Sequence, residues 1–326
     1  MSVPPSRRQT RYARYAWGVL AWNVAVVLWG AFVRASGSGA GCGRHWPRCN
    51  GQVIPHSPSA RTLIEFTHRL MTGADGFLVL GLLAGAFLVW RAGSPVRKGA
   101  VLAACFLVTE ALVGAALVLF EHVAEDRSAG RVWWMALHLV NTLFLLASLA
   151  LTAWWASGGA AIRLRGQGKL AAAMLLAVFA TVVVGTTGAI TALGDTLYPK
   201  QQVGIREAAT ATFLERLRLV HPIVAVVTAL YVVLAGAIAR RMRPGAATAR
   251  LSRLLAALFA AQVVAGTINV ILLAPVWMQI VHLLLADAVW IALVCTTAAA
   301  LAAPDDPVDD PPPIRTDRPA LSRASA

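Results

Sequence analysis

Long apolar segments recur along the whole chain, and they limit its possible folds more than any other feature. A helix needs about 20 mostly apolar residues to cross the hydrocarbon core of a bilayer. In lipid such segments must be helical, because other open backbone would leave its polar groups unpaired. The predicted spans are Tyr15–Val33, Leu63–Trp90, Val101–Phe120, Val132–Trp155, Leu170–Leu193, Leu219–Ala239, Leu254–Ala274 and Val276–Ala303, with Pro275 separating the last two. The sequence therefore predicts an all-α, polytopic membrane protein with eight transmembrane helices.

Composition and charge agree with lipid as the solvent of this chain. Of its 326 residues, 58% are hydrophobic and only 13% are charged, which is too few charged residues for a soluble domain of this size. The net charge of +14 does not indicate a nucleic-acid partner, because the basic residues cluster in short segments between the spans. These segments, at residues 7–14, 91–98, 163–169, 240–253 and 315–323, all fall on one predicted side. Because cytoplasmic loops carry the excess of Lys and Arg, we expect a multi-pass protein of the cell (inner or plasma) membrane with both termini cytoplasmic.

Features of the first four spans return in the same order in the last four. His138 and His282 lie early in the fourth and eighth spans, and Glu110 before Gly114 is matched by Gln262 before Gly266. Such a parallel repeat predicts two pseudo-symmetric four-helix bundles. The predicted units are an N-terminal bundle (residues 1–160), a C-terminal bundle (161–303) and a Pro- and Asp-rich tail (304–326) that we expect to be disordered and cytoplasmic.

Each even-numbered span contains one histidine, and these four are the main candidates for a functional site: His68, His138, His221 and His282. All lie at a similar depth, roughly 10 Å below the outer surface at the helical rise of about 1.5 Å per residue. A single intramembrane histidine often serves only as a hydrogen-bonding group between helices. Four at one depth, two in each half, favour axial ligands of heme iron, whereas zinc or copper needs further ligands nearby. We therefore expect two bis-histidine heme sites, His68 with His138 and His221 with His282.

Glu65 lies three residues before His68, on the same helical face. Two interpretations stand: a structural pair with Arg69, or a group that handles protons or stabilises positive charge at the heme edge. Arg218 holds the corresponding place before His221, so the halves are chemically unequal. This inequality predicts one reacting heme and one electron-carrying heme.

Cys42 and Cys49 flank a short segment of the first outer loop. In an oxidising compartment such a pair favours a disulfide, and a reversible redox pair is a second interpretation. A metal site that also uses His45 and His56 is a third.

Five arginines near the outer ends of the spans are candidates for binding heme propionates, and lipid headgroups are an equally good partner for each. They are Arg34, Arg61, Arg206, Arg216 and Arg218.

Several motifs together resemble those of heme A synthases, in order and across all eight spans. They are residues 30–51 with the Cys42 and Cys49 loop, residues 64–69 around Glu65 and His68, the run His138–Thr142, residues 192–196, His221-Pro222, Gln262 with Gly266 and Asn269, and the run His282–Asp287.

The resemblance implies a membrane oxidoreductase that converts a ring methyl of heme O into the formyl group of heme A. It implies a substrate site with Glu65, His68 and His138 as catalytic residues, and a cofactor heme b bound by His221 and His282. It also implies a Cys42–Cys49 disulfide, whereas the second cysteine pair that many bacterial members carry in the loop between the fifth and sixth spans is absent from residues 194–218.

The product is expected to serve heme-copper terminal oxidases of the same membrane. Partners implied with it are the heme O synthase and terminal oxidase assembly factors. The alternatives are a diheme b-type electron-transfer cytochrome and, less well supported by the scattered polar residues, a transporter built from parallel repeats.

Overall fold

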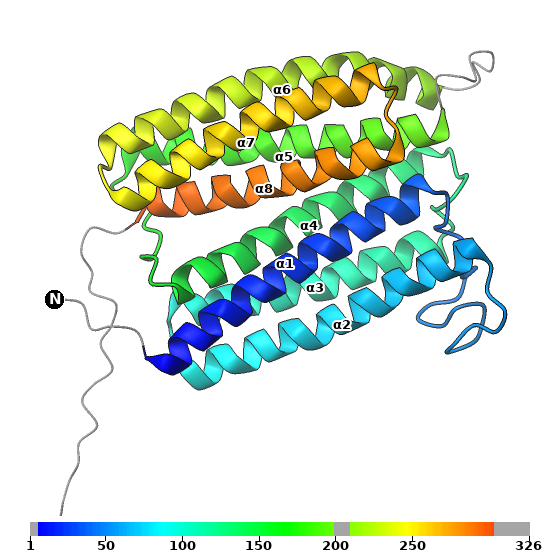
Figure 1. Cartoon of the computed structure of the whole chain (residues 1–326), viewed down its shortest axis with the longest axis horizontal. Coiled ribbons are helices and arrows are strands. Elements are labelled where there is room, and N and C mark those ends of the chain that lie inside the picture. Colours follow the sequence, from blue (N-terminus) through cyan, green and yellow to red (C-terminus); the bar gives the residue numbers. More distant parts are fainter. Residues whose placement is uncertain (1–5, 199–208, 303–326) are drawn as a thin grey trace, which may run out of the picture.

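The computed structural model describes residues 6–198 and 209–302, which fold into eight α-helices (Figure 1). They are α1 (Arg7–Ala35), α2 (Ala60–Val89), α3 (Pro95–Leu119), α4 (Ala129–Ala156), α5 (Gly168–Leu197), α6 (Ala209–Met242), α7 (Ala246–Ile271) and α8 (Val276–Ala300). All eight contain a stretch long and apolar enough to cross a membrane. The predicted all-α fold with eight membrane-spanning helices is confirmed. The predicted tail, residues 304–326, lies outside the described residues.

Most helices begin several residues before the predicted apolar spans, because their first turns are polar and capped. Ser6, Ser59, Ser94 and Ser128 precede α1 to α4, and each side chain accepts a hydrogen bond from a backbone N–H of the first turn. Such caps satisfy donors that the helix itself leaves free, so polar turns remain helical beyond the apolar stretch. The predicted break between the last two spans is confirmed, since Pro275 stands at the N-cap of α8.

The helices form two groups of four that lie side by side, α1–α4 and α5–α8 (Figure 1). Helices α1, α4, α5 and α8 make the contacts between the groups. The side chains of Leu146, Leu149 and Leu293 are buried in this shared core. Across it, the indole N–H of Trp290 on α8 donates a hydrogen bond to the backbone oxygen of Leu143 on α4, at 2.8 Å. The two groups are therefore joined by a continuous apolar core.

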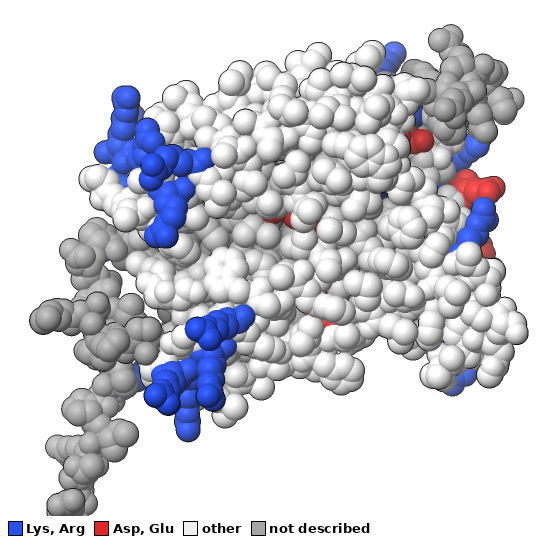
Figure 2. Space-filling model, in the orientation of Figure 1, with Lys and Arg blue, Asp and Glu red and all other residues white. Residues whose placement is uncertain are grey.

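Charge separates the two ends of the molecule. In Figure 2, Lys and Arg gather at the end where α1 begins and α8 finishes, whereas the opposite end carries acidic and basic side chains together. We call these the basic end and the loop end; the loop end contains the connections 36–59, 120–128 and 272–275. Between them lies a nearly uncharged band (Figure 2), and large apolar side chains in the middle of the helices, such as Phe77 and Leu80 of α2, are exposed. Such a band is suited to contact with lipid.

Candidate functional site

Each of the four candidate ligand histidines packs its ring against a glycine on the preceding helix. The four pairs are Gly30 with His68, Gly114 with His138, Gly188 with His221, and Gly266 with His282. A Cβ at Gly188 or Gly266 would lie 2.9 Å from Cε1 of the neighbouring ring, and one at Gly30 would lie 3.1 Å from it. At Gly114 the same distance is 3.8 Å, an ordinary contact. The glycines therefore give the imidazoles room beside the neighbouring backbone.

The four rings lie toward the loop end, in two pairs. His68 is close enough to His138 to interact with it electrostatically, and the same holds for His221 and His282. These are the pairs that the sequence predicts, each within one group of four helices. Ligation of iron by the pairs stays a prediction.

A carboxylate lies beside His138, and in the sequence this residue stands out only as part of the repeat. Nδ1 of His138 lies 3.2 Å from Oε1 of Glu110 on α3. Asn141 donates to Oε2 of Glu110 at 2.6 Å, and the hydroxyl of Thr142 donates to Oε1. The sequence shows that Glu110 lies one helical turn before Gly114 in the repeat, but only the structure shows that this face of α3 meets His138.

The other three rings have weaker polar partners. Nδ1 of His221 lies 3.2 Å from the hydroxyl of Thr187 on α5. Nε2 of His282 lies 3.3 Å from the amide nitrogen of Gln262 on α7. Nδ1 of His68 is buried and has no hydrogen-bond partner among the described residues. A carboxylate beside the ring thus distinguishes His138 from the others.

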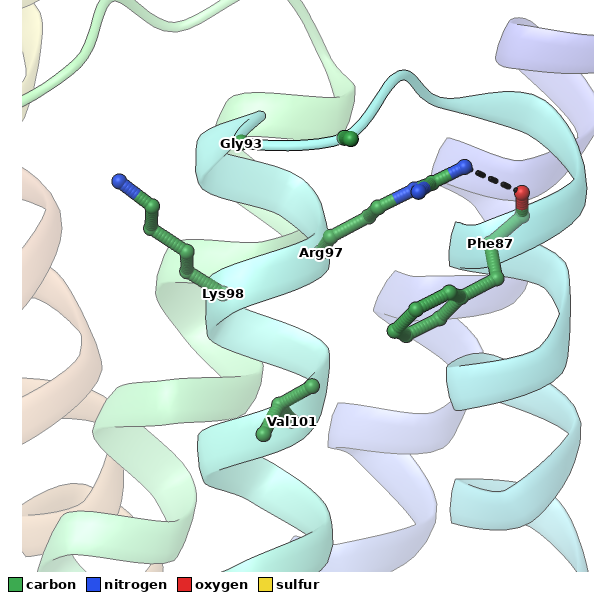
Figure 3. Close-up of a pocket in the computed structure, with 6 residues that line it drawn as sticks. Phe87, Gly93, Arg97, Lys98 and Val101 are labelled. Carbon is green, nitrogen blue, oxygen red and sulfur yellow. Dashed lines mark hydrogen bonds between the residues drawn. The ribbon is translucent and has the colours of Figure 1, made fainter.

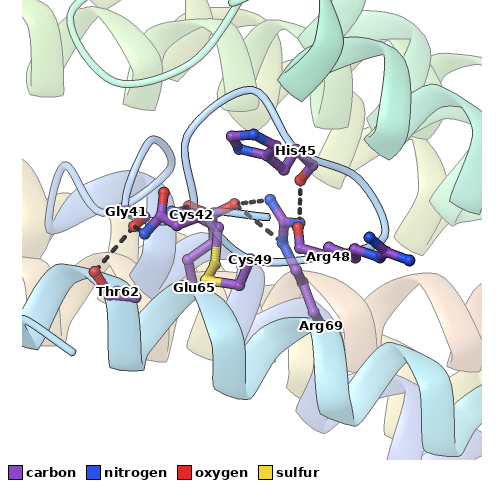
Figure 4. Close-up of polar contacts among 9 residues, drawn as sticks. Gly41, Cys42, His45, Arg48, Cys49, Thr62, Glu65 and Arg69 are labelled. Atoms are coloured by element: carbon purple, nitrogen blue, oxygen red, sulfur yellow. Dashed lines mark hydrogen bonds and ion pairs between the residues drawn. A yellow bond between two sulfur atoms is a disulfide. The ribbon is translucent and has the colours of Figure 1, made fainter. Parts of the chain in front are cut away.

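Glu65 is buried and is tied to the loop between α1 and α2 (Figure 4). Its Oε1 pairs with the guanidinium of Arg69, and its Oε2 accepts a hydrogen bond from the backbone N–H of Cys42 at 2.8 Å. Arg69 also donates to the backbone oxygens of His45 and Arg48, at 2.6 and 2.7 Å. The structural interpretation of Glu65 is therefore realised in the fold, and its catalytic role stays a prediction.

Cys42 and Cys49 form the expected disulfide, and both are buried. Both sulfur atoms are consumed, so the alternative metal site with His45 and His56 is wrong. Among residues 6–198 and 209–302 there is no cluster of three or more His, Cys, Asp or Glu side chains that could hold a metal ion. The disulfide instead closes the loop that Glu65 and Arg69 hold against α2.

The candidate propionate-binding arginines fall into different environments. Arg34 donates to the backbone oxygen of Ala192 and to Thr196 on α5, both at 2.7 Å, and to Gln279 on α8 at 3.0 Å. Arg218 forms an ion pair with Asp195 at 2.7 Å. Arg61 and Arg216 are exposed, and Arg206 lies outside the described residues. Arg34 is thus engaged in joining the two halves.

A surface pocket of about 400 Å³ lies near the basic end, between α2 and α3 (Figure 3). Phe87, Arg97, Lys98 and Val101 line it, and Arg97 donates a hydrogen bond to the backbone oxygen of Phe87 at 2.6 Å. None of the four histidines lines this pocket, so it is separate from the paired rings.

Heme fits the residues that the fold brings together. Two imidazoles without a third protein ligand are the donor set that bis-histidine heme iron uses. The side chain of His138 keeps 29% of its area accessible, and the Nδ1 atoms of His68, His138 and His282 make no hydrogen bond in the described structure, although Nδ1 of His138 lies within ion-pair distance of Glu110. These observations define a membrane-embedded helical protein with two candidate heme sites.

Comparison with known proteins shows the family. The COX15-CtaA family of cytochrome oxidase assembly proteins matches residues 13–294, and the chain belongs to this family. Heme A synthases of Bacillus mycoides (strain KBAB4) and Bacillus cereus (strain AH187) are 44% and 45% identical to it over 131 and 129 residues. These segments cover 39% of this chain, and 39% and 38% of the two relatives. The predicted resemblance to heme A synthases is confirmed.

A longer relative carries a different name. A protein of Thermus thermophilus named protoheme IX farnesyltransferase is 53% identical to this chain over 296 residues. The alignment covers 90% of this chain and 49% of that protein, so the chain spans about half the length of this relative.

Proposed function

We propose that this protein is a heme A synthase, which oxidises a ring methyl of heme O to the formyl group of heme A. The observation that carries the proposal is the pairing of four histidine rings at one end of two four-helix groups, in a chain of the cytochrome oxidase assembly family. The Bacillus heme A synthases add support from sequence identity.

The two halves have different roles in this proposal. His68 and His138 hold heme O as the substrate, and His221 and His282 hold a heme b cofactor. Heme b supplies a one-electron redox centre when it is bound. Conversion of a methyl group and one water into a formyl group releases four electrons and four protons. An external acceptor must take up these electrons, and a heme held by His221 and His282 would supply the redox centre for that transfer.

Glu65 is the proposed proton-handling group of the N-terminal half, together with the loop that it holds. Its carboxylate lies on the face of α2 that carries His68, one turn toward the loop end. Arg69 and the N–H of Cys42 fix the position of this carboxylate. The Cys42–Cys49 disulfide restrains this loop.

The name of the Thermus relative fits this assignment. Transfer of a farnesyl group to protoheme is the reaction that supplies heme O. We infer that a heme O synthase supplies the substrate of this protein. The heme A product serves heme-copper terminal oxidases, and assembly factors of these oxidases are further candidate partners.

The proposed location is the cell membrane, with the basic end in the cytoplasm and the paired histidines toward the outer side. The gathering of Lys and Arg at the basic end supports this orientation (Figure 2).

The decisive experiment measures the hemes themselves. Membranes that contain a heme O source and this protein are extracted, and the hemes are identified by mass. Heme A is expected with the wild-type chain and absent with His138→Ala, while His138→Ala retains the heme of the C-terminal half. Unchanged heme O with a folded, heme-loaded wild-type protein would contradict the proposal and favour an electron-transfer cytochrome.

A further inference from the structure

A polar network lies beside His138, and residues 6–198 and 209–302 show no counterpart of it beside His282. The repeat aligns Gly114 with Gly266 and His138 with His282, which sets the correspondence of neighbouring positions. In the N-terminal half the network consists of Thr109, Glu110, Asn141 and Thr142. The corresponding positions of α7 and α8 hold Ala261, Gln262, Leu285 and Ala286.

The network fixes a carboxylate against one ring. Oε1 of Glu110 faces Nδ1 of His138 at 3.2 Å, and Thr142 donates to the same oxygen. Oε2 accepts from Asn141 at 2.6 Å, and Thr109 in turn donates to Asn141 at 2.6 Å. Both carboxylate oxygens of Glu110 therefore have hydrogen-bond donors. These hydrogen bonds hold Oε1 in its place beside the ring of His138.

The C-terminal half has a neutral amide, Gln262, at the corresponding position of α7, and it contacts the other ring nitrogen, Nε2, of His282. Gln262 contacts His282 through its amide nitrogen at 3.3 Å, so that it offers the ring a donor. The Oε1 atom of Gln262 is buried without a partner in the described structure, because Leu285 and Ala286 have no polar side-chain group. His282 therefore has neither an anionic acceptor nor a network that would hold one.

We propose that Glu110 is a positioning residue for the heme that His138 binds, and that its carboxylate gives this heme the lower reduction potential of the two. The inference rests on the proposed function for its premise that both histidine pairs bind heme. A carboxylate that accepts from the second nitrogen of a ligand imidazole fixes the ring and makes it a stronger donor. A stronger axial donor stabilises ferric iron, and this lowers the potential. With both hemes bound, this order of potentials would favour electron transfer from the N-terminal half to the C-terminal half.

The test is a redox titration of the purified protein with both hemes bound, followed by absorbance at one fixed pH. Two midpoint potentials are expected, and the His282→Ala protein identifies the one that belongs to the N-terminal heme. Glu110→Gln should raise that potential and leave the other in place, whereas Glu110→Asp should restore most of the difference. Unchanged potentials in Glu110→Gln, with both hemes retained, would overturn the proposal.

A graft into the other half covers the case in which Glu110→Gln loses heme. Gln262→Glu with Leu285→Asn and Ala286→Thr rebuilds the carboxylate and its two donors beside His282. This variant should lower the potential of the C-terminal heme, and no change in a heme-loaded protein contradicts the proposal. Neither titration requires turnover, so failure to make heme A would refute the proposed function and leave the assignment of Glu110 standing.

Discussion

The N-terminal half contains two buried or partly buried glutamates, Glu65 on α2 and Glu110 on α3, whose carboxylates have different partners. Glu65 is neutralised by Arg69 and bound to the disulfide loop, whereas Glu110 faces the ring of His138. The sequence indicated an inequality between the halves and attributed it to Glu65. The contacts show a second, more direct source of that inequality in Glu110.

Loss of the Glu65–Arg69 ion pair should loosen the disulfide loop. Arg69→Leu leaves the buried carboxylate without its cation and removes both donors to the loop backbone, at a cost on the order of 3–5 kcal/mol for a broken buried pair. The loop should loosen, which is measured as faster reduction of the Cys42–Cys49 disulfide by an external thiol. Glu65→Gln keeps an acceptor for the N–H of Cys42 and should loosen the loop less. If Glu65 acts on the substrate, Glu65→Gln loses heme A formation even though its disulfide stays protected; full activity would remove Glu65 from the mechanism.

At the scale of the elements, the molecule is a series of helical hairpins in which a glycine of the first helix meets a histidine of the second. This contact recurs in α1–α2, α3–α4, α5–α6 and α7–α8. Because glycine has no Cβ, the ring can lie close to the neighbouring backbone without distorting either helix.

Substitution of these glycines should therefore have graded effects. Gly266→Ala places a methyl group 2.9 Å from Cε1 of His282, and overpacking of this kind costs about 1–3 kcal/mol. Heme binding in the C-terminal half should weaken by roughly 5- to 150-fold. Gly114→Ala, at 3.8 Å from the ring of His138, should have a much smaller effect on the N-terminal site.

Heme titration by absorbance measures both effects. Gly76→Ala on α2 is the control, because nothing lies within 4 Å of the added methyl group. Equal losses at Gly76 and Gly266 would show that the effect does not come from the ring contact.

The connection between α3 and α4 contains the acid-sensitive element outside the membrane. Partial burial opposes ionisation of Asp126, but hydrogen bonds from His122 and Ser128 outweigh it and lower the pKa of the carboxyl. A lowered pKa means that the carboxylate stabilises the folded loop above the ordinary value of 3.8, and that this stability is lost as pH falls through the folded pKa.

The measurement is amide exchange of residues 120–128, corrected for its intrinsic pH dependence. Protection that depends on Asp126 should persist down to pH 3.8 and be lost only below it. Asp126→Asn should lower protection at neutral pH as well, because the amide loses the charge that binds Ser128 and His122. At about pH 5 the carboxylate of Asp126 is still ionised, so the wild-type loop should stay protected. If the wild-type loop loosened at this pH and the loop of Asp126→Asn did not, the assignment would be contradicted.

At the scale of the whole molecule, Arg34 joins the two halves near the level of the histidines. It belongs to α1, yet all three of its hydrogen-bond acceptors lie on α5 and α8. Trp290 makes a second connection deeper in the shared core. The C-terminal site is therefore supported by a residue of the N-terminal half.

Arg34→Ala should accordingly destabilise the whole protein rather than one half. A hydrogen bond to a charged group contributes about 1.5–3 kcal/mol, and Arg34 makes three. Thermal unfolding should occur at lower temperature, with both hemes lost in one transition. Arg127→Ala is the matched control, because Arg127 is exposed and its contact with the Tyr198 ring contributes only about 0.5–1 kcal/mol. Separate transitions in the wild-type protein would argue against coupling of the halves.

The sequence by itself determined the number and type of the helices, the break at Pro275, the four histidines and the family. Hydrophobic length and intramembrane polar residues are local properties that the bilayer constrains strongly, so they can be read from a linear pattern. Only the tertiary structure decided what Glu65, Glu110 and Arg34 contact. The helix period places Glu65 near Arg69, but it cannot show that Cys42 returns to the same carboxylate from 23 residues away. Contacts between helices depend on how those helices pack and rotate against one another, and no single segment contains that information.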